Sequence, residues 1–420
     1  MDQSYLMKVS NLKDLSVSLS DTSVLIINAG SSSIKMSLFS MPSEKLLATG
    51  VADRIGQQEV TLKWNIEGSP RQIDLGAATH QQAIAEMLDI LFDAIDKTTI
   101  AAVGHRIVHG GERFVAPTRL DESVITEIQS LSHLAPLHNP ANLSGVDAAM
   151  QHLPGVPHVA VFDTAFHHGM PERAYMYAVP YAWYREHGVR RYGFHGTSHH
   201  YVAQQAAAML NRPFNDCRLI TVHLGNGCSA AAIAGGISID TTMGMTPMEG
   251  LVMGTRCGDI DPGLHEYIAR ESGNSLGIIT DALNHQSGLL GLSGISNDMR
   301  RVLAAAEEGD ERAILAVELF CYRLAKSLAG LAVSLERVDA IVFTGGIGEH
   351  AVEIRSKSMS QLKLLGVKLD EQMNQDHGKL SDGMISSSDS AFPILVVATS
   401  EEKMIARYLL DHLDSEESVS

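Results

Sequence analysis

The sequence predicts an α/β protein in which helices cover sheets of mostly buried strands. Apolar side chains recur at steps of three and four over residues 313–335, which predicts a helix with one buried face. Shorter helical patterns over residues 81–95 and 201–210 separate segments of strand character. Five short apolar runs end abruptly at small or polar residues, as strands covered on both faces do: 24–27, 159–162, 219–224, 341–343 and 394–397.

Two segments repeat one design, which indicates a duplicated fold. Residues 24–39 and 219–233 each read as an apolar strand, a turn of small residues and a second apolar strand. Turns of this kind leave backbone N–H groups open to phosphate oxygens. The plainer alternative is a pair of ordinary β-hairpins, because Asn-Gly is also a strong hairpin turn.

Charge and composition exclude several classes of protein. The 420 residues include 32 Lys and Arg against 49 Asp and Glu, a formal net charge of −17, so we expect no nucleic-acid partner. We expect no membrane span, because Glu318, Arg323 and Lys326 interrupt the most apolar stretch. Four cysteines without regular spacing suit a cytoplasmic location. Residues 1–22 are interpreted as an N-terminal extension.

Three glycine-rich loops each follow a predicted strand. They are residues 28–33 with Lys35 nearby, residues 223–227 and residues 343–349. No GxxxxGK[ST] motif is present, and no GxGxxG follows a strand, so a phosphate site has to be built otherwise. Because ligands collect at the carboxyl ends of strands in such folds, the three loops together predict a polyphosphate site.

Arg106 and Arg256 both lie in glycine-rich surroundings that let a ligand approach closely. A guanidinium fork suits carboxylate or phosphate oxygens. For a single arginine, a surface or ion-paired role is the stronger interpretation, but two arginines in such loops favour anion binding.

Histidines and acids supply further candidates. The cluster HGTSHH at residues 195–200 lacks the HExxH pattern of a zinc hydrolase, and Gly196 and Thr197 are poor helix formers, so we do not expect a structural metal there. His195 is a candidate donor to developing charge. Asp163 and Glu401 each follow an apolar strand, and each is either a helix cap or first-turn acid, or a catalytic or metal-binding group.

From about residue 24 to residue 407 the chain resembles the acetate/propionate kinase family. The motifs that carry this resemblance are VLIINAGSSSIK, GHRIVHGGE, LAPLHNP, VAVFDTAFH, YGFHGTSH, VHLGNG, MEGLVMGTRCGDIDPG, LSGISNDMR and TGGIGEH. The resemblance implies an ATP:acetate phosphotransferase of the actin-like (ribonuclease H-like) ATPase superfamily that forms a homodimer. It implies two duplicated α/β domains with a cleft between them. The first would be residues 23–165 plus 400–420, and the second, residues 166–399, would carry much of the nucleotide site and the dimer surface.

The resemblance also implies roles for individual residues. Asn28 and Glu401 would hold Mg²⁺, with Mn²⁺ as a substitute, and Ser31, Ser33 and Lys35 would surround the phosphates. Arg106 would bind the acetate carboxylate, while Asp163, His195 and Arg256 would be catalytic. His138 and His199 match family histidines near the cleft. The methyl pocket would be Val108, Leu137, Phe194 and Pro247, and ATP would contact His223, Leu224, Gly225, Asn226, Gly227, Asp298, Met299, Arg300, Gly346, Ile347, Gly348, Glu349 and His350.

The chemistry that the resemblance implies is a reversible, direct in-line transfer of the γ-phosphoryl group, which gives acetyl phosphate and ADP. Acetate is ionised at neutral pH, so positioning and charge cancellation matter more than a general base. His350, Met299 and Gly345 differ from the usual family pattern, which leaves the base preference open. The alternatives are a propionate kinase and a non-transferring actin-like ATPase.

Overall fold

The structure, a computed structural model, describes residues 22–30, 32–136 and 138–419. Most of the predicted N-terminal extension and the candidate residues Ser31 and Leu137 therefore lie outside the described residues. The described residues pack as two compact units: those within Met1–Arg106, Ala141–Ala160 and Ile405–Ser420 form the first, and those within Ile107–Pro140 and Val161–Met404 form the second. The domain limits implied by the resemblance stay a prediction. None of the described helices is both long and apolar enough to cross a membrane.

The first unit is built on strands of the larger sheet, whose order is β5-β4-β3-β2-β1-β6-β8-β7. Strands β1 to β5 pair antiparallel in turn, and β1 also pairs parallel with β6. The strands of this sheet are β1 Thr22–Ala29, β2 Ser33–Met41, β3 Lys45–Asp53, β4 Val60–Ile66, β5 Ser69–Gly76, β6 Ile100–Ile107, β7 Thr118–Arg119 and β8 His158–Phe162.

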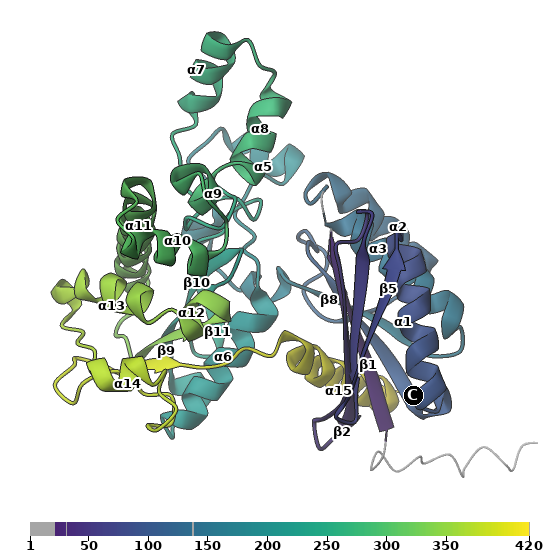
Figure 1. The fold of residues 1–420 in the computed structure, drawn as a ribbon. Coiled ribbons are helices and arrows are strands. Elements are labelled where there is room, and N and C mark those ends of the chain that lie inside the picture. The colour runs from purple at the N-terminus through teal and green to yellow at the C-terminus, as the bar shows by residue number, and fades with distance from the viewer. Residues whose placement is uncertain (1–21, 31, 137, 420) are drawn as a thin grey trace, which may run out of the picture. The chain divides into compact units, whose positions relative to one another are not determined.

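Helices cover this sheet within the first unit. Helix α1 (His80–Ala94), labelled in Figure 1, starts with a capping box at Thr79. It buries Ile84, Met87 and Leu88 in the core that β1 to β4 share. Gly104 makes room for α15 (Glu401–Val419), because a Cβ there would lie 2.8 Å from the side chains of both Ile405 and Leu409. Strand β1 is thus buried on both faces.

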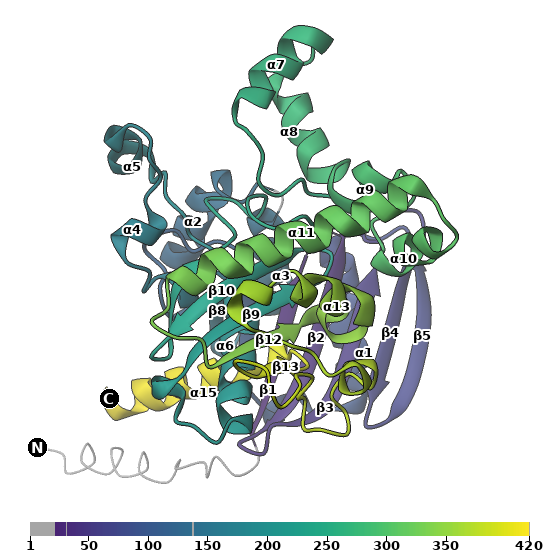
Figure 2. The same cartoon turned by 90° about the vertical axis from the view of Figure 1, so that its left-hand side faces the viewer.

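The second unit holds the smaller sheet, whose order is β11-β10-β9-β12-β13. Strands β9, β10 and β11 pair antiparallel, whereas β12 runs parallel to both β9 and β13. Helix α11 (Glu311–Val333) lies across β9 and β10, as Figure 2 shows, and buries Phe320, Leu324 and Leu328 there. The strands are β9 Arg218–Leu224, β10 Cys228–Ala234, β11 Ile237–Thr241, β12 Ala340–Thr344 and β13 Ile394–Val396.

The remaining helices are short. The α-helices are α2 Glu122–Ser130, α3 Asn139–His152, α4 Glu172–Tyr175, α5 Tyr181–His187, α6 Gly196–Met209, α7 Gly263–Ser272, α8 Leu276–His285, α9 Gly288–Ser293, α10 Met299–Glu307, α12 Gly345–His350, α13 Val352–Ser360 and α14 Glu371–Gln375. The 3₁₀ helices are η3 Lys97–Thr99, η4 Leu131–His133, η5 Ala165–His167, η6 Phe214–Asp216 and η7 Lys363–Leu365.

The five predicted strands, both predicted hairpins and the three predicted helices are confirmed, with shifts at their ends. Helix α6 begins at Gly196, five residues before the predicted start at residue 201, although Gly196 and Thr197 are poor helix formers. His195 turns the chain at φ +58°, and a Cβ at Gly196 would lie 2.3 Å from the carbonyl oxygen of Asp163. This close packing outweighs the weak helix propensity of the two residues.

Candidate active site

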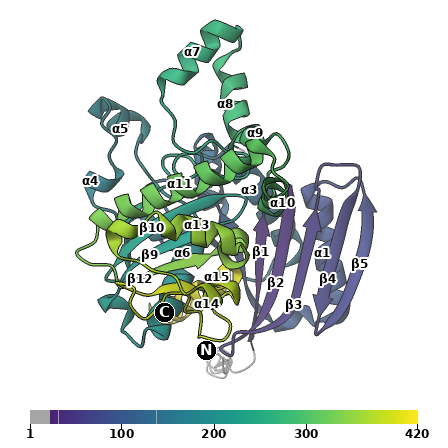
Figure 3. The same cartoon turned by 60° about the vertical axis from the view of Figure 1, so that its left-hand side comes forward.

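In the first unit, polar side chains gather where β1 and β6 end. Arg106, near the end of β6, donates from Nη1 to Oδ1 of Asn28 at 3.1 Å. Across the β1–β2 hairpin, visible in Figure 3, Asn28 is paired with Lys35, and the backbone N–H of Gly30 donates to the carbonyl of Ser33 at 2.7 Å. Four residues that the resemblance assigned to metal, phosphate and carboxylate thus meet at one sheet edge. Their charges and oxygens suit an anion with its cation.

In the second unit, two glycine-rich loops meet at the same edge of the smaller sheet. Strand β9 ends at Leu224, and the neighbouring parallel strand β12 ends at Thr344, which is paired with His223. Gly345 opens α12 with φ +77°, and a Cβ there would lie 2.7 Å from the carbonyl oxygen of Leu224. The backbone at residue 345 therefore lies directly on the end of β9, which brings the two loops together.

These loops and the start of α10 form a pocket of about 580 Å³, a size typical of small-molecule sites. Eight of its lining residues were predicted to contact ATP: Gly225, Asn226, Asp298, Met299, Arg300, Gly346, Ile347 and His350. The sequence analysis missed the other four, which are Asn297, Leu303, Ala351 and Glu353. Asn297 directly precedes the predicted set and its Nδ2 donates to Oδ1 of Asn226 at 3.1 Å, so the SNDMR motif held a signal for it.

Two of the residues predicted to bind the nucleotide form hydrogen bonds to other residues around the pocket. Asp298 caps α10 and forms an ion pair with Arg300 at 2.6 Å, and that hydrogen-bonded pair lowers the pKa of the Asp298 carboxyl. Glu349 Oε1 accepts from the backbone N–H groups of Gly345 at 3.0 Å and Thr399 at 3.2 Å. Glu349 therefore fixes the loop that starts α12, although it does not line the pocket itself.

Arg355 braces the far end of α12. Its side chain is fully buried, and its five N–H groups serve five acceptors. Nη1 donates to the carbonyls of Gly348 and Glu349, while Nε and Nη2 bond Asn374 and His377. Burial lowers the pKa of Arg355 to about 10, so the guanidinium is still charged at neutral pH and faces the negative end of the helix dipole.

His195 and Arg256 approach one point next to this pocket, the backbone of Gly227. A Cβ at Gly227 would lie 3.3 Å from Cε1 and Nε2 of His195 and 3.5 Å from Nη1 of Arg256. The same Nη1 donates to the carbonyl of Pro247 at 3.1 Å. Asn226 holds the arginine loop, because its carbonyl accepts from Gly254 N–H at 2.9 Å. A ring nitrogen and a guanidinium therefore flank the glycine that closes the β9 turn.

Two series of hydrogen bonds between histidines and hydroxyl groups extend from His195 and from its neighbour His223. His195 Nδ1 and His199 Nε2 both bond Ser229 Oγ at 2.8 Å, and His199 Nδ1 bonds Thr221 Oγ1 at 2.7 Å. Burial holds the pKa of His199 well below its usual range. His223 stacks on His195 with ring centroids 4.4 Å apart. The Nδ1 of His223 bonds Ser198 Oγ, which in turn bonds the hydroxyl of Thr399, the residue two before Glu401.

Asp163 lies at the turn that presents His195. It follows β8, and its carbonyl accepts from the N–H of Gly196 at 3.0 Å. The residue before η5 is Thr164, so the cap interpretation of Asp163 is wrong for that segment. Glu401 is the first residue of α15, as its structural alternative expected, and a role at a metal stays a prediction.

Two of the predicted methyl-pocket residues belong to one core, and a third lies beside Arg256. Val108 and Phe194 are buried in the core of the second unit, and Pro247 contacts Arg256 through its carbonyl. Leu137 lies outside the described residues. The apolar contacts and the arginine thus come from segments far apart in the sequence.

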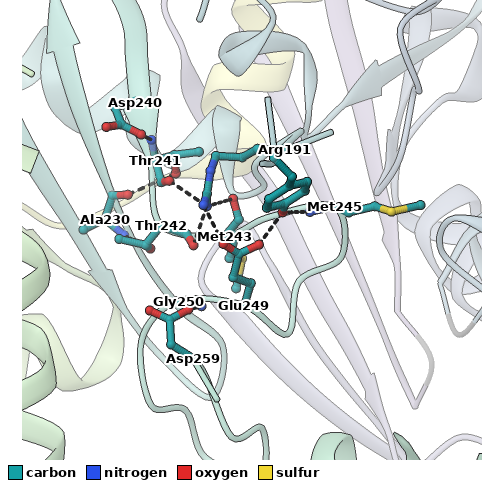
Figure 4. A network of polar contacts seen from close by, with 11 residues as sticks. Arg191, Ala230, Asp240, Thr241, Thr242, Met243, Met245, Glu249, Gly250 and Asp259 are labelled. Carbon is teal, nitrogen blue, oxygen red and sulfur yellow. Dashed lines mark hydrogen bonds and ion pairs between the residues drawn. The ribbon is translucent and has the colours of Figure 1, made fainter. Parts of the chain in front are cut away.

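A polar network, drawn in Figure 4, fixes the loop that carries Pro247. Arg191 Nη1 donates to the carbonyls of three consecutive residues, Thr241 to Met243, at 2.9 to 3.0 Å, and its Nη2 pairs with Glu249 at 2.5 Å. The hydroxyl of Tyr177 donates to the other oxygen of Glu249 and accepts from Met245 N–H at 2.9 Å. Sequence analysis missed this network because its members share no motif.

Across the described ranges, no three His, Cys, Asp or Glu side chains gather to hold a metal on their own. Mg²⁺ needs only one or two protein oxygens when substrate phosphates complete its shell. Asn28, with its amide oxygen, and Glu401, with a carboxylate, have the donor chemistry for such an ion.

The protein has a mixed-sheet α/β fold with glycine loops at the strand ends. A pocket large enough for a nucleotide lies next to a histidine and an arginine. Together these features define a phosphotransferase. The acetokinase family model matches residues 23–407, and the chain belongs to that family. The acetate kinase of Deinococcus radiodurans is 52% identical over 383 residues, 91% of this chain and 96% of that protein. The acetate kinase of Thermotoga maritima is 48% identical over 390 residues, 91% and 97% of the two chains.

Solved structures of the same family have the same fold. A propionate kinase from Francisella tularensis matches with a TM-score of 0.88 and 42% identity, over 92% of this chain and 98% of that one. The acetate kinase of Porphyromonas gingivalis matches with a TM-score of 0.85 and 41% identity, over 93% of this chain and all of that one. The fold is therefore that of the actin-like ATPases, as the resemblance implied.

Proposed function

We propose that the protein transfers the γ-phosphoryl group of ATP reversibly to acetate, giving acetyl phosphate and ADP. Membership of the acetokinase family and the acetate kinases about 50% identical over most of the chain support acetate kinase activity. The observation that carries the mechanism is the convergence of His195 and Arg256 on Gly227, beside the nucleotide pocket. We also propose that the protein forms a homodimer, lies in the cytoplasm and supplies acetyl phosphate for acetyl-CoA synthesis.

Charge cancellation is the main task of the protein groups. A carboxylate that attacks a phosphoryl group brings two anions together, and the charge then spreads over the equatorial oxygens. Arg106 binds the acetate carboxylate, while Arg256 and a donor on His195 stabilise the phosphoryl oxygens. Asp163 orients this region through the His195 turn, and because acetate carries no proton to remove, no general base is required.

Asn28 and Glu401 would hold the divalent ion. Mg²⁺, or Mn²⁺ in its place, would neutralise charge on the β- and γ-phosphates when bound. Lys35 and Ser33 supply a cation and a hydroxyl for the phosphates, and Ser31 and Leu137 keep the roles that the resemblance gave them. The loop residues Leu224 and Gly348 contribute backbone groups rather than side chains to nucleotide binding.

A hydroxylamine trap tests the proposal directly. Protein, Mg·ATP, acetate and hydroxylamine should yield acetyl hydroxamate, because hydroxylamine captures acetyl phosphate. ATP hydrolysis without hydroxamate would instead support a non-transferring ATPase. Replacing acetate by propionate tests the second candidate, which the Francisella tularensis structure favours. We expect turnover with both acids and a higher kcat/KM for acetate than for propionate, because one methylene changes this ratio by only about 10 to 200-fold.

A further inference from the structure

The contact at Nδ1 of His195 does not by itself determine which ring nitrogen carries the proton. Its Nδ1 contacts a hydroxyl, Ser229 Oγ, and a hydroxyl both donates and accepts. A neutral imidazole carries one proton, so the nitrogen that holds it decides whether Nε2 donates or accepts. At His167, by contrast, Nε2 contacts the carbonyl of Phe194 at 2.9 Å, which only accepts, so His167 carries its proton on Nε2.

The other hydrogen bonds of Ser229 and His199 limit which nitrogen of His195 can carry the proton. Ser229 has one proton and two imidazole partners, so it donates to one and accepts from the other. His199 is fully buried and neutral, and it therefore donates at one ring nitrogen and accepts at the other. Only two arrangements of the protons satisfy these three contacts with a neutral His195. In the first, Thr221 donates to His199, His199 donates to Ser229, and Ser229 donates to His195. In the second, every one of these hydrogen bonds runs in the opposite direction.

The surroundings of Nε2 select the first arrangement. Nε2 faces Gly227, on whose other side lies the guanidinium of Arg256. A lone pair on Nε2 would repel the phosphoryl oxygens that Arg256 attracts, whereas an N–H group would bind them. When Ser229 donates to Nδ1, the proton of His195 has to lie on Nε2, and the ring becomes a donor without gaining charge.

We propose that Ser229, with His199 and Thr221 behind it, is a positioning residue that fixes neutral His195 as its Nε2–H tautomer. This inference rests on the proposed function, since it assigns the donor for the phosphoryl group. All three supporting side chains are fully buried on β9, β10 and α6, and Ser229 keeps its backbone pairing with His223 whatever its side chain. The relay is therefore rigid, as a preorganised donor has to be.

Activity over a range of pH tests the relay. Ser229→Ala should lower kcat about tenfold, the effect of one lost hydrogen bond, with little change in KM for ATP. The deficit should be smaller at low pH, where imidazoles become protonated, because a protonated His195 carries both N–H groups and needs no relay. Charged or titratable groups near His195 include His199 of α6, His223 of β9 and Arg256, and the wild type and the variant share them. A deficit that is constant with pH would overturn the proposal.

Two further variants separate positioning from folding. Thr221→Val, which keeps the side-chain shape, should give a smaller deficit with the same pH trend. Ser238→Ala breaks another buried serine–histidine bond, the 2.7 Å contact with His167, and should keep wild-type kcat at every pH. An equal, pH-independent loss in Ser238→Ala would mean that loosened packing is the cause.

The tautomer itself can be observed in the full-length protein. Two-bond ¹H–¹⁵N spectra of ¹⁵N-histidine-labelled protein distinguish Nδ1–H from Nε2–H, and comparison with His195→Gln identifies the signals. We expect Nε2–H in the wild type and a mixture in Ser229→Ala; Nδ1–H in the wild type would overturn the inference. This readout needs no turnover, so it stays decisive if the hydroxylamine trap fails and the proposed function falls.

Discussion

The imidazole of His195 and the guanidinium of Arg256 meet at one glycine. The Nε2 of His195 lies 3.3 Å, and the Nη1 of Arg256 3.5 Å, from the position that a Cβ of Gly227 would occupy. Gly227 thus keeps free the space that both groups face. The geometry explains why a glycine follows Asn226 here, where a hairpin turn alone would accept other residues.

Gly227→Ala should therefore lower kcat. The added methyl group would have to displace the His195 ring by a few tenths of an ångström, and we expect a loss of about 10-fold, below the roughly 10²-fold cost of a misplacement of about 1 Å. Steady-state kinetics check this. Gly330→Ala on α11, where a Cβ would meet nothing within 4 Å, is the matched control and should keep wild-type turnover. Wild-type kcat in Gly227→Ala would argue against a site at this glycine.

Arg256→Ala should depress turnover far more than nucleotide binding. The guanidinium acts on charge that develops during transfer, and removing one preorganised donor costs about 10² to 10³-fold in kcat. Turnover and the Kd of ATP, measured separately, test the split. The exposed Arg270→Ala serves as control. An unchanged kcat would rule out the assigned role.

Val108→Ala should shift preference toward propionate. Removing two methyl groups from a buried pocket residue leaves room for one more methylene, and the acetate-to-propionate ratio of kcat/KM should fall by about 10 to 200-fold. Val367→Ala, an equally buried position in the same core, should leave the ratio unchanged. If both variants change the ratio alike, Val108 does not line the acid pocket.

Tyr177→Phe should loosen the loop that holds Pro247. The change removes the hydroxyl that bonds Glu249 and Met245 N–H, which costs about 1 to 3 kcal/mol of stability. We expect a several-fold higher KM for acetate and an unchanged KM for ATP. Tyr192→Phe removes a comparable bond to Gly188 and should lower stability without affecting KM for acetate. Parallel changes in both KM values would contradict a local role of the network.

The stability of the fold should fall in mild acid. Burial lowers the pKa of His109 and of His167 to about 4, against about 6.5 in the unfolded chain. Between these values the unfolded chain binds protons that the native protein does not, so the free energy of unfolding decreases as pH falls from about 6.5 to about 4. Urea unfolding at about pH 7 and pH 5 measures the difference.

Replacing one of these histidines checks the cause of that acid sensitivity. His167→Gln should reduce the difference in unfolding free energy between the two pH values, because one titrating group is lost. The exposed His187→Gln should retain it. A wild-type pH difference in His167→Gln would place the acid sensitivity elsewhere.

The sequence was a good guide to elements whose signal is local. The continuous apolar runs of β1 and β9 reflect burial on both faces of the sheet, and the periodicity of α11 reflects burial at every third or fourth residue. The structure confirms both. The start of α6 was misjudged because the packing of Gly196 against Asp163 is a contact between residues 33 positions apart, which no propensity contains.

The candidate site divides in the same way. Glycine loops and their neighbours carry visible motifs, so eight pocket residues were predicted. Ser229, Thr221 and Tyr177 act through single hydroxyl groups on strands or loops of ordinary composition. Only the fold, which sets a hydroxyl opposite a ring nitrogen or a carboxylate, distinguishes them from any other serine, threonine or tyrosine.

The fully bonded guanidinium of Arg355 has a consequence for how the nucleotide pocket opens. Because its five bonds tie residues 348–349 to residues 374–377, either segment that detached alone would leave buried guanidinium N–H groups unpaired. Lysine has three donors and cannot reproduce the arrangement. One wall of the pocket and a segment about 25 residues further along the chain should therefore exchange their amide hydrogens as one cooperative piece, with a shared opening free energy.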